Sequence, residues 1–141
     1  MTLRQVHHQL QVATRGRGFT DVTKQLRDFL AAHAAREGLL TVFLQHTSAS
    51  LVVQENADPD VRVDLERFFA ELVPDGDARF RHDAEGPDDM PAHVRAALTQ
   101  TQLSVPVQHG ALALGTWQAV YLYEHRTAPH RRTLALHYLG S

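Results

Sequence analysis

Three polar side chains follow directly on one of the most apolar stretches of the chain. His46, Thr47 and Ser48 come after residues 39–45, which are almost continuously apolar and predict a buried strand. Burying a hydrogen-bonding group without a partner costs about 1–3 kcal/mol, so these side chains must meet each other, a metal or a ligand. The end of a core strand holds side chains rigidly, as a site requires. A turn whose hydroxyls bond the local backbone is an equally good interpretation.

Two further histidines have spacings that match no local metal motif. His82 lies in the long polar stretch of residues 75–90, and His93 is the third residue of a short helix predicted from Pro91. A catalytic site of three histidines can still assemble from distant segments and keep one coordination position open for water. Taken singly, each histidine is more typical of a surface or capping residue. Because the chain has no cysteine, a metal would sit in an open, working site and not in a structural one.

The other candidate side chains lie on the last two predicted strands. Trp117, the one tryptophan, and Gln118 point to opposite faces if their strand is regular. Trp117 fits either core packing or the mouth of a pocket, where it would stack on a heteroaromatic ring. Glu124 ends this strand and Arg131 and Arg132 begin the next, so a hairpin would bring Glu124 near an arginine. The simplest interpretation is a surface ion pair that contributes little.

The elements that must position these residues can be predicted from periodicity and from capping residues. Alternation and apolar runs predict strands, whereas helical spacing, an Asp58–Pro59 start and a glycine stop at Gly38 predict helices. The predicted strands cover residues 6–14, a short stretch after Gly18, 39–45, 51–54, 103–107, 117–124 and 132–139; the predicted helices lie in 21–37, 57–76 and 91–100. This order predicts an α+β fold, with helices packed on a largely antiparallel or mixed sheet.

Length and charge bound the class of protein. A single compact domain over residues 1–141 is expected, since a chain of about 150 residues buries roughly two-thirds of its unfolded surface without disulfides. The net charge of −2 gives no general attraction to nucleic acid. No run approaches the roughly 18 apolar residues that span a membrane, and no signal peptide is evident, so a cytoplasmic protein with no membrane partner is expected.

The common nucleotide-binding and acyl-transfer motifs are absent from the sequence. It contains no G-x-x-x-x-G-K-[ST], no dinucleotide-binding glycine pattern, no G-x-S-x-G and no Cys–His pair. We therefore do not expect a nucleotide-binding or acyl-transfer enzyme of a familiar type.

Six segments in order resemble the YjbQ-like family, which is also labelled secondary thiamine-phosphate synthase. They are "LQHTSASL", "EN" followed by "DPDVRVDLERFF", "EGPDDMPAHVRAAL", "LSVPV", "GALALGTWQAVYLYEHR" and the "RR" near the end. The match covers nearly the whole chain, and the combination of "HTSAS", "DDMPAH" and "LGTWQ" is highly specific. The resemblance implies a compact α+β fold assembled as a homotrimer, with sites near the subunit boundaries.

The resemblance also implies a set of functional residues. It carries over to the matching positions His46, Thr47, Ser48, Asn56, His82, His93, Trp117, Gln118, Glu124 and Arg131. The family's glycine-rich turn before the arginine is replaced by residues 128–130, Ala-Pro-His, so Arg132 is an alternative to Arg131. We expect the hydroxyls and the arginine to bind phosphate and Trp117 to stack on a ring. The histidines would then act as general acids or as metal ligands.

The activity that the resemblance implies joins hydroxymethylpyrimidine diphosphate to a thiazole phosphate and releases pyrophosphate. A departing diphosphate needs oxyanion stabilisation, often with Mg²⁺. The alternative is a metal-dependent hydrolase or a protein that binds a small phosphorylated ligand. In that alternative His46, His82 and His93 hold zinc or a similar divalent ion, and thiamine-phosphate synthesis is incidental. In both cases the partner is a small phosphorylated molecule.

Overall fold

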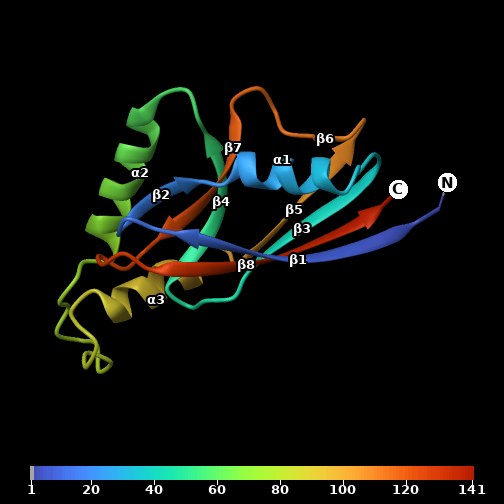
Figure 1. The fold of residues 1–141 in the computed structure, drawn as a ribbon. Helices are drawn as coiled ribbons and strands as arrows, with labels where there is room; N and C mark the ends of the chain where they lie inside the picture. Colours follow the sequence, from blue (N-terminus) through green and yellow to red (C-terminus); the bar gives the residue numbers. More distant parts are fainter. Residues whose placement is uncertain (1) are drawn as a thin grey trace.

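The computed structural model describes residues 2–141, in which eight strands and three helices alternate along the chain. Figure 1 shows the fold. In chain order the elements are β1 (Arg4–Ala13), β2 (Gly18–Asp21), α1 (Thr23–Ala32), β3 (Gly38–Leu44), β4 (Ala49–Glu55), α2 (Pro59–Leu72), α3 (Asp89–Leu98), β5 (Gln102–Gln108), β6 (Ala111–Leu112), β7 (Gln118–Glu124) and β8 (Arg131–Gly140).

The strands form two antiparallel sheets where the sequence predicted one. The larger sheet has the order β1-β8-β3-β5-β6, and the smaller has the order β2-β7-β4. All pairings in both sheets are antiparallel. The α+β class is therefore confirmed, and the mixed sheet that was left open does not occur among the described strands. The chain passes between the two sheets six times, and three of these crossings join β1 to β2, β3 to β4 and β7 to β8.

These three crossings meet at one end of the molecule, which we call the corner (residues 14–17, 45–48 and 125–130). Hydrogen bonds tie the crossings together: Thr14 N donates to the His130 carbonyl at 2.8 Å, and His125 N donates to the Ser48 carbonyl at 3.3 Å. Since Ala49 and Gly18 both pair with Glu124, the smaller sheet begins at this same end. The corner lies beside α3 on the left of Figure 1.

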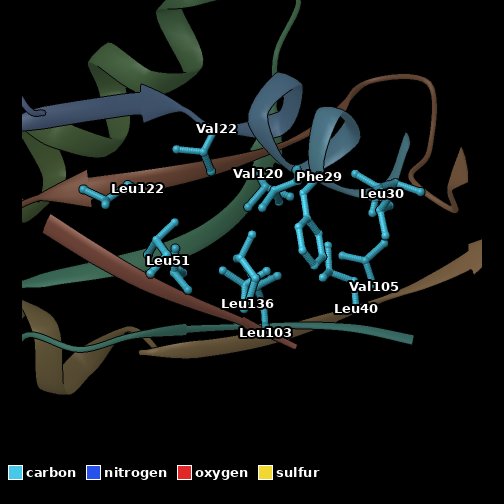
Figure 2. Packing of buried hydrophobic residues seen from close by; sticks show 14 of the residues in the cluster. Val22, Phe29, Leu30, Leu40, Leu51, Leu103, Val105, Val120, Leu122 and Leu136 are labelled. Atoms are coloured by element: carbon cyan, nitrogen blue, oxygen red, sulfur yellow. The ribbon is translucent and has the colours of Figure 1, made fainter. Parts of the chain in front are cut away.

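The core lies between the inner face of the larger sheet and a layer made of α1 and the smaller sheet. Alternate residues of β3, β5 and β8 point inward, among them Leu40, Val105 and Leu136. Figure 2 shows them facing Phe29 of α1 and Val120 of β7. Burying one such side chain stabilises the fold by about 1.5–3 kcal/mol. The packing of the two layers therefore holds the strand ends that form the corner in place.

The outer face of the larger sheet carries exposed apolar side chains. Leu39, Phe43 and Leu139 are 42%, 46% and 47% exposed, although each belongs to a central strand of that sheet. On α2, Phe68 and Leu72 are also exposed. α2 has no fully buried residue and covers the smaller sheet mainly through half-buried side chains.

The first helix is shorter than its pattern predicted. α1 ends at His33, and Ala34 adopts a left-handed φ of 49°. Gly38 was expected to end the helix, but it begins β3, where an added Cβ would lie 2.3 Å from the Leu139 carbonyl. This glycine is required by the close approach of β3 and β8, and not by the helix end.

No helix within residues 2–141 is long and apolar enough to cross a membrane.

Candidate functional site

A buried ion pair lies at the centre of the corner. Glu124 is fully buried at the end of β7, and Arg132, the second residue of β8, is 4% exposed. The Arg132 guanidinium donates to both carboxylate oxygens of Glu124, with Nε 2.8 Å from Oε1. It also donates to the Ser48 hydroxyl at 2.9 Å. The hairpin did bring Glu124 to an arginine, but the interpretation of a surface pair was wrong because the corner excludes water from both charges.

Arg131 lies on the opposite face of the same strand. Its side chain is exposed, and Nη1 contacts the Gln11 side chain of β1 at 3.3 Å. Since side chains alternate along a strand, only one of the two arginines can enter the corner. The structure places Arg132 in the corner. It was the predicted alternative to Arg131 because of the altered turn at residues 128–130.

The ion pair keeps Glu124 charged. Burial acts to raise the pKa of Glu124, but hydrogen bonds from Arg132 and Thr14 and the charge of the guanidinium outweigh it, so the pKa falls below its usual value. The Thr14 hydroxyl donates to Oε1 at 2.8 Å. With its oxygens engaged by Arg132 and Thr14, Glu124 positions the corner and does not reach a ligand directly.

His46 is also engaged within the corner. Its Nε2 accepts the backbone N–H of Thr133 at 2.8 Å, which places the imidazole proton on Nδ1. Burial and the nearby Arg132 charge lower the pKa of His46, so the ring is kept neutral. The predicted convergence of His46 with the two other histidines is wrong, because a lone pair that binds Thr133 is not free for a metal.

The two other histidines do converge, with Asp89 as the third member. Nε2 of His82 lies 2.6 Å from Oδ2 of Asp89, and Nε2 of His93 lies 3.4 Å from Oδ1. Within residues 2–141 these three form the group of histidine and carboxylate side chains that could hold a metal ion, and their donor atoms lie within 4.8 Å of one another. We call this group the His–Asp–His cluster (His82, Asp89 and His93).

The cluster is joined to the corner on both sides. Nδ1 of His93 donates to the Thr47 carbonyl at 2.9 Å, which leaves the Nε2 lone pair of His93 facing Asp89. A histidine that ligates a metal almost always donates its other ring N–H in this way. Arg126, just past β7, contacts Asp89 at 3.0 Å and the neighbouring Asp88 at 3.0 Å. The cluster is therefore oriented by segments that begin at the ends of β3 and β7.

Asp89 is kept ionised although it is almost fully buried. Its side chain is only 3% exposed, and burial acts to raise its pKa. Hydrogen bonding with Glu85 and with His82, together with the Arg126 charge, outweighs burial, so the pKa of Asp89 lies below its usual value. An ionised carboxylate beside two imidazole nitrogens is a donor set typical of zinc or of another first-row divalent cation. The residues present thus fit a metal ion.

The remaining predicted residues gather at the other end of the smaller sheet, which we call the distal end (Asn56, Trp117 and Gln118). The Asn56 N–H donates to the Trp117 carbonyl at 2.9 Å, just before β7 begins. Trp117 is 62% exposed, so the core-packing alternative is wrong. The amide oxygen of Gln118 accepts the Gly115 N–H at 2.7 Å and closes the local turn. Gln118 and Glu124 are the two ends of β7, roughly 20 Å apart along an extended strand.

Asp89 is the site residue that the sequence prediction missed. The helix was predicted from Pro91, but α3 begins at Asp89, with Asp88 as the N-cap. The signal was present, because Asp89 and His93 are four residues apart and residues at this spacing share one face of a helix. No local sequence pattern marks Arg126, because it lies beside α3 only in the folded chain, at the corner.

Comparison with known proteins identifies relatives along nearly the whole length. Residues 8–141 match the family model described as UPF0047 protein YjbQ-like. The UPF0047 protein sll1880 of Synechocystis sp. is 49% identical over 139 residues, which cover 99% of this chain and 95% of that protein. The UPF0047 protein YjbQ of Escherichia coli O157:H7 is 47% identical over 118 residues, or 83% of this chain and 85% of the relative.

Solved structures share the fold. A conserved hypothetical protein of Thermus thermophilus superposes with a TM-score of 0.82 at 36% identity, covering 92% of this chain and 97% of the other. A YbjQ-like protein of unknown function from Sulfolobus solfataricus P2 superposes with a TM-score of 0.87 and covers 99% and 100%. At 20% identity this second likeness concerns the fold alone.

Proposed function

The chain belongs to the YjbQ-like UPF0047 family, and from the geometry of its corner we propose that it is a metal-dependent enzyme acting on a small phosphorylated molecule. The observation that carries the proposal is the His–Asp–His cluster, whose donor atoms lie within 4.8 Å of one another. Three protein ligands that leave further coordination positions open are typical of catalytic metal sites. The proposed reaction is hydrolysis of a phosphate ester or of a phosphoanhydride.

The donor distances support cation binding without a rearrangement of the backbone. Ligand bonds of 2.0–2.2 Å in tetrahedral geometry separate the donors by about 3.4 Å. The His93–Asp89 separation of 3.4 Å matches this spacing. His82 is hydrogen-bonded to the other oxygen of the same carboxylate at 2.6 Å, so its side chain would move outward as an ion replaced that hydrogen bond. A divalent cation in this position would lower the pKa of water and polarise a phosphoryl oxygen.

The chain's own groups would orient the reactants around the cluster. Thr47 is exposed and adjoins the cluster through the bond from its carbonyl to His93, so its hydroxyl can donate to a phosphate oxygen. Arg126 holds the Asp89 carboxylate in its ionised form and is engaged by Asp88 as well, which makes it a positioning residue. Ser48 is turned inward to Arg132 and supports the turn that carries Thr47.

Metal content and metal-dependent hydrolysis test the proposal together. We expect purified protein to bind about one zinc or similar ion per chain and to release inorganic phosphate from phosphate esters only when loaded. His93→Ala should lose both properties, because it removes a ligand from a rigid helix. His109→Ala is the matched control, since the His109 side chain is 94% exposed and remote from the cluster. Equal metal content in wild type and His93→Ala would overturn the proposal.

A second candidate function is the transferase reaction that the sequence resemblance implies. In it the carbon–oxygen bond of hydroxymethylpyrimidine diphosphate breaks, the thiazole nitrogen forms a bond to that carbon, and pyrophosphate leaves. The exposed ring of Trp117 favours this candidate, because an unburied indole can stack on a pyrimidine. Pyrophosphate release that requires both precursors and is lost in Trp117→Ala would support it. Release that is unchanged in this variant would count against it.

The proposal includes assembly as a homotrimer through the outer face of the larger sheet. The residues of β3, β5 and β8 that point outward include no acidic side chain and no lysine, and Leu39, Phe43 and Leu139 are exposed among them. A partly apolar face whose one charged side chain is Arg131 can pack on a second copy with little repulsion. Light scattering should give three times the 15.8 kDa chain mass, and Phe43→Glu should give a smaller species. A monomeric wild type would contradict the assembly.

A further inference from the structure

The segment between α2 and α3 was predicted to be a long polar loop, and it folds into a closed Ω-loop (residues 75–88). Gly76 N donates to the Pro87 carbonyl at 3.0 Å, so the two ends of the loop are joined. Asp75 binds Arg17 at 2.8 Å, and Asp88 binds Arg126 at 3.0 Å, so each end is also fixed to the corner. Compact loops of this kind are frequently functional.

The Ω-loop and the first turn of α3 enclose a cavity of about 480 Å³. This volume lies within the range of small-molecule sites. Phe80, Pro87, Met90 and Pro91 form the apolar part of the wall, and Asp77 and Asp83 are among its polar residues. His82 lines the same cavity, and its Nε2 belongs to the His–Asp–His cluster. The cavity therefore adjoins the proposed metal centre through one shared imidazole.

The charges around the cavity exclude several classes of ligand. Asp77 is paired with Arg79 at 2.6 Å, whereas Asp83 has no basic side chain within 4.0 Å among the described residues. An unpaired carboxylate repels a ligand group that is itself anionic. The side chains of Phe80, Pro87 and Met90 offer apolar surface to a ring or an alkyl group. An uncharged, flat apolar group suits these walls best.

We propose that this cavity binds the organic group of the substrate, an aryl or similarly apolar group, while the attached phosphate reaches the metal centre beside His82. This inference rests on the proposed function and names the substrate class of the same site: phosphate esters of apolar alcohols or phenols. Burying a phenyl-sized group contributes enough free energy for a roughly 10- to 100-fold gain in affinity.

Two non-hydrolysable phosphonates separate the cavity from the metal centre. Phenylphosphonate and methylphosphonate carry the same anion, but only the first has a ring to bury. We expect calorimetry on the zinc-loaded protein to show phenylphosphonate binding at least about 10-fold more tightly. Ala78→Phe should abolish this preference, since Ala78 lines the cavity and a larger side chain would fill it without removing any packing.

The matched control is Ala84→Phe, which adds the same ring to an exposed alanine of the same loop that does not line the cavity. This control should keep the full preference, and both variants should keep the zinc content and the methylphosphonate affinity of the wild type. Equal affinities for the two phosphonates, with zinc and methylphosphonate still bound, would overturn the cavity assignment and leave the proposed function standing. If the wild-type protein binds no zinc, the proposed function is overturned, and this inference with it.

Discussion

The two ends of the smaller sheet place polar residues in opposite environments. At the corner, Glu124 and Arg132 are buried together and hold Ser48 by a hydrogen bond. At the distal end, Trp117 is 62% exposed and its neighbour Asn56 is exposed as well. The same two strands, β4 and β7, connect the ends, so the difference comes from what covers them. Three chain crossings, α3 and the Ω-loop enclose the corner.

This difference teaches which kind of chemistry each end can perform. Rigid, desolvated groups hold their geometry and feel one another's charge strongly, as a metal site or an acid–base site requires. An exposed aromatic ring gains little from a fixed position until a ligand or a second subunit covers it. We therefore propose that the reacting groups are those of the His–Asp–His cluster, which the rigid corner orients, and that the distal end has a binding role.

The largest expected effect comes from breaking the buried ion pair. Arg132→Met leaves Glu124 charged, buried and unpaired, which should lower the free energy of unfolding by about 3–5 kcal/mol. Urea denaturation measures the change. The matched control is Arg131→Met on the exposed face of the same strand, which should change stability by less than about 0.5 kcal/mol.

The double variant Glu124→Leu/Arg132→Met sharpens this test. Removing both charges should recover most of the loss, because the cost arises from an uncompensated charge and not from lost packing. Similar stabilities for Arg132→Met and Arg131→Met would show that the corner is wetter than the structure indicates, and the contrast between the two ends would fail.

The second expected effect is a loss of stability in acid that originates at the corner. His125 is fully buried, and burial together with the nearby Arg95, Arg17 and Arg132 charges lowers its pKa from 6.5 to about 3. Below pH 6.5 the unfolded chain therefore takes up a proton that the folded chain refuses. The free energy of unfolding should fall by up to about 1.4 kcal/mol per pH unit from pH 6.5 toward pH 3.

Unfolding measured at pH 6.5, 5.5 and 5.0 tests this slope above the range in which most carboxylates titrate. His125→Gln keeps an amide nitrogen near the Ser50 hydroxyl, which lies 2.9 Å from His125 Nε2, and should show a flatter pH dependence. His109→Gln, which changes an exposed histidine, should retain the wild-type slope. Identical slopes in all three proteins would show that His125 does not cause the loss of stability in acid.

The smallest expected effect is at the distal end. Trp117→Ala should change the free energy of unfolding by less than about 0.5 kcal/mol, because the indole is mostly in water and buries little apolar area. Denaturation of the dilute protein provides the measurement. A loss above about 2 kcal/mol would mean that the ring is covered in solution, for example by a second subunit, and that the distal end resembles the corner.

The positions of the elements could largely be predicted from the sequence, because local signals determine them. The apolar run before His46 and the Asp58–Pro59 helix start lie where the structure has a strand end and a helix start. Gly38 and Arg132 were harder to predict, since close strand approach and burial depend on which strands become neighbours. Local pattern therefore located the elements, and tertiary pairing decided which side chains meet.

Asp89 shows the same limit within the candidate site. Its position beside His93 follows from the helical spacing, but its role depends on His82, which arrives from the Ω-loop, and on Arg126, which arrives from the end of β7. His46 had the stronger motif, yet the backbone N–H of Thr133 occupies its free nitrogen. A motif identifies residue types, and only the fold decides which of their lone pairs are available.

Anomalous diffraction at the zinc edge from crystals soaked in a zinc salt tests the central claim most directly. The account predicts one strong peak, with Nε2 of His82, Nε2 of His93 and a carboxylate oxygen of Asp89 at about 2.0–2.2 Å. In His46→Ala crystals the peak should remain, because His46 is not a ligand. A peak bound by His46, or no peak at the His–Asp–His cluster in the wild type, would contradict the assignment of that cluster as a metal centre.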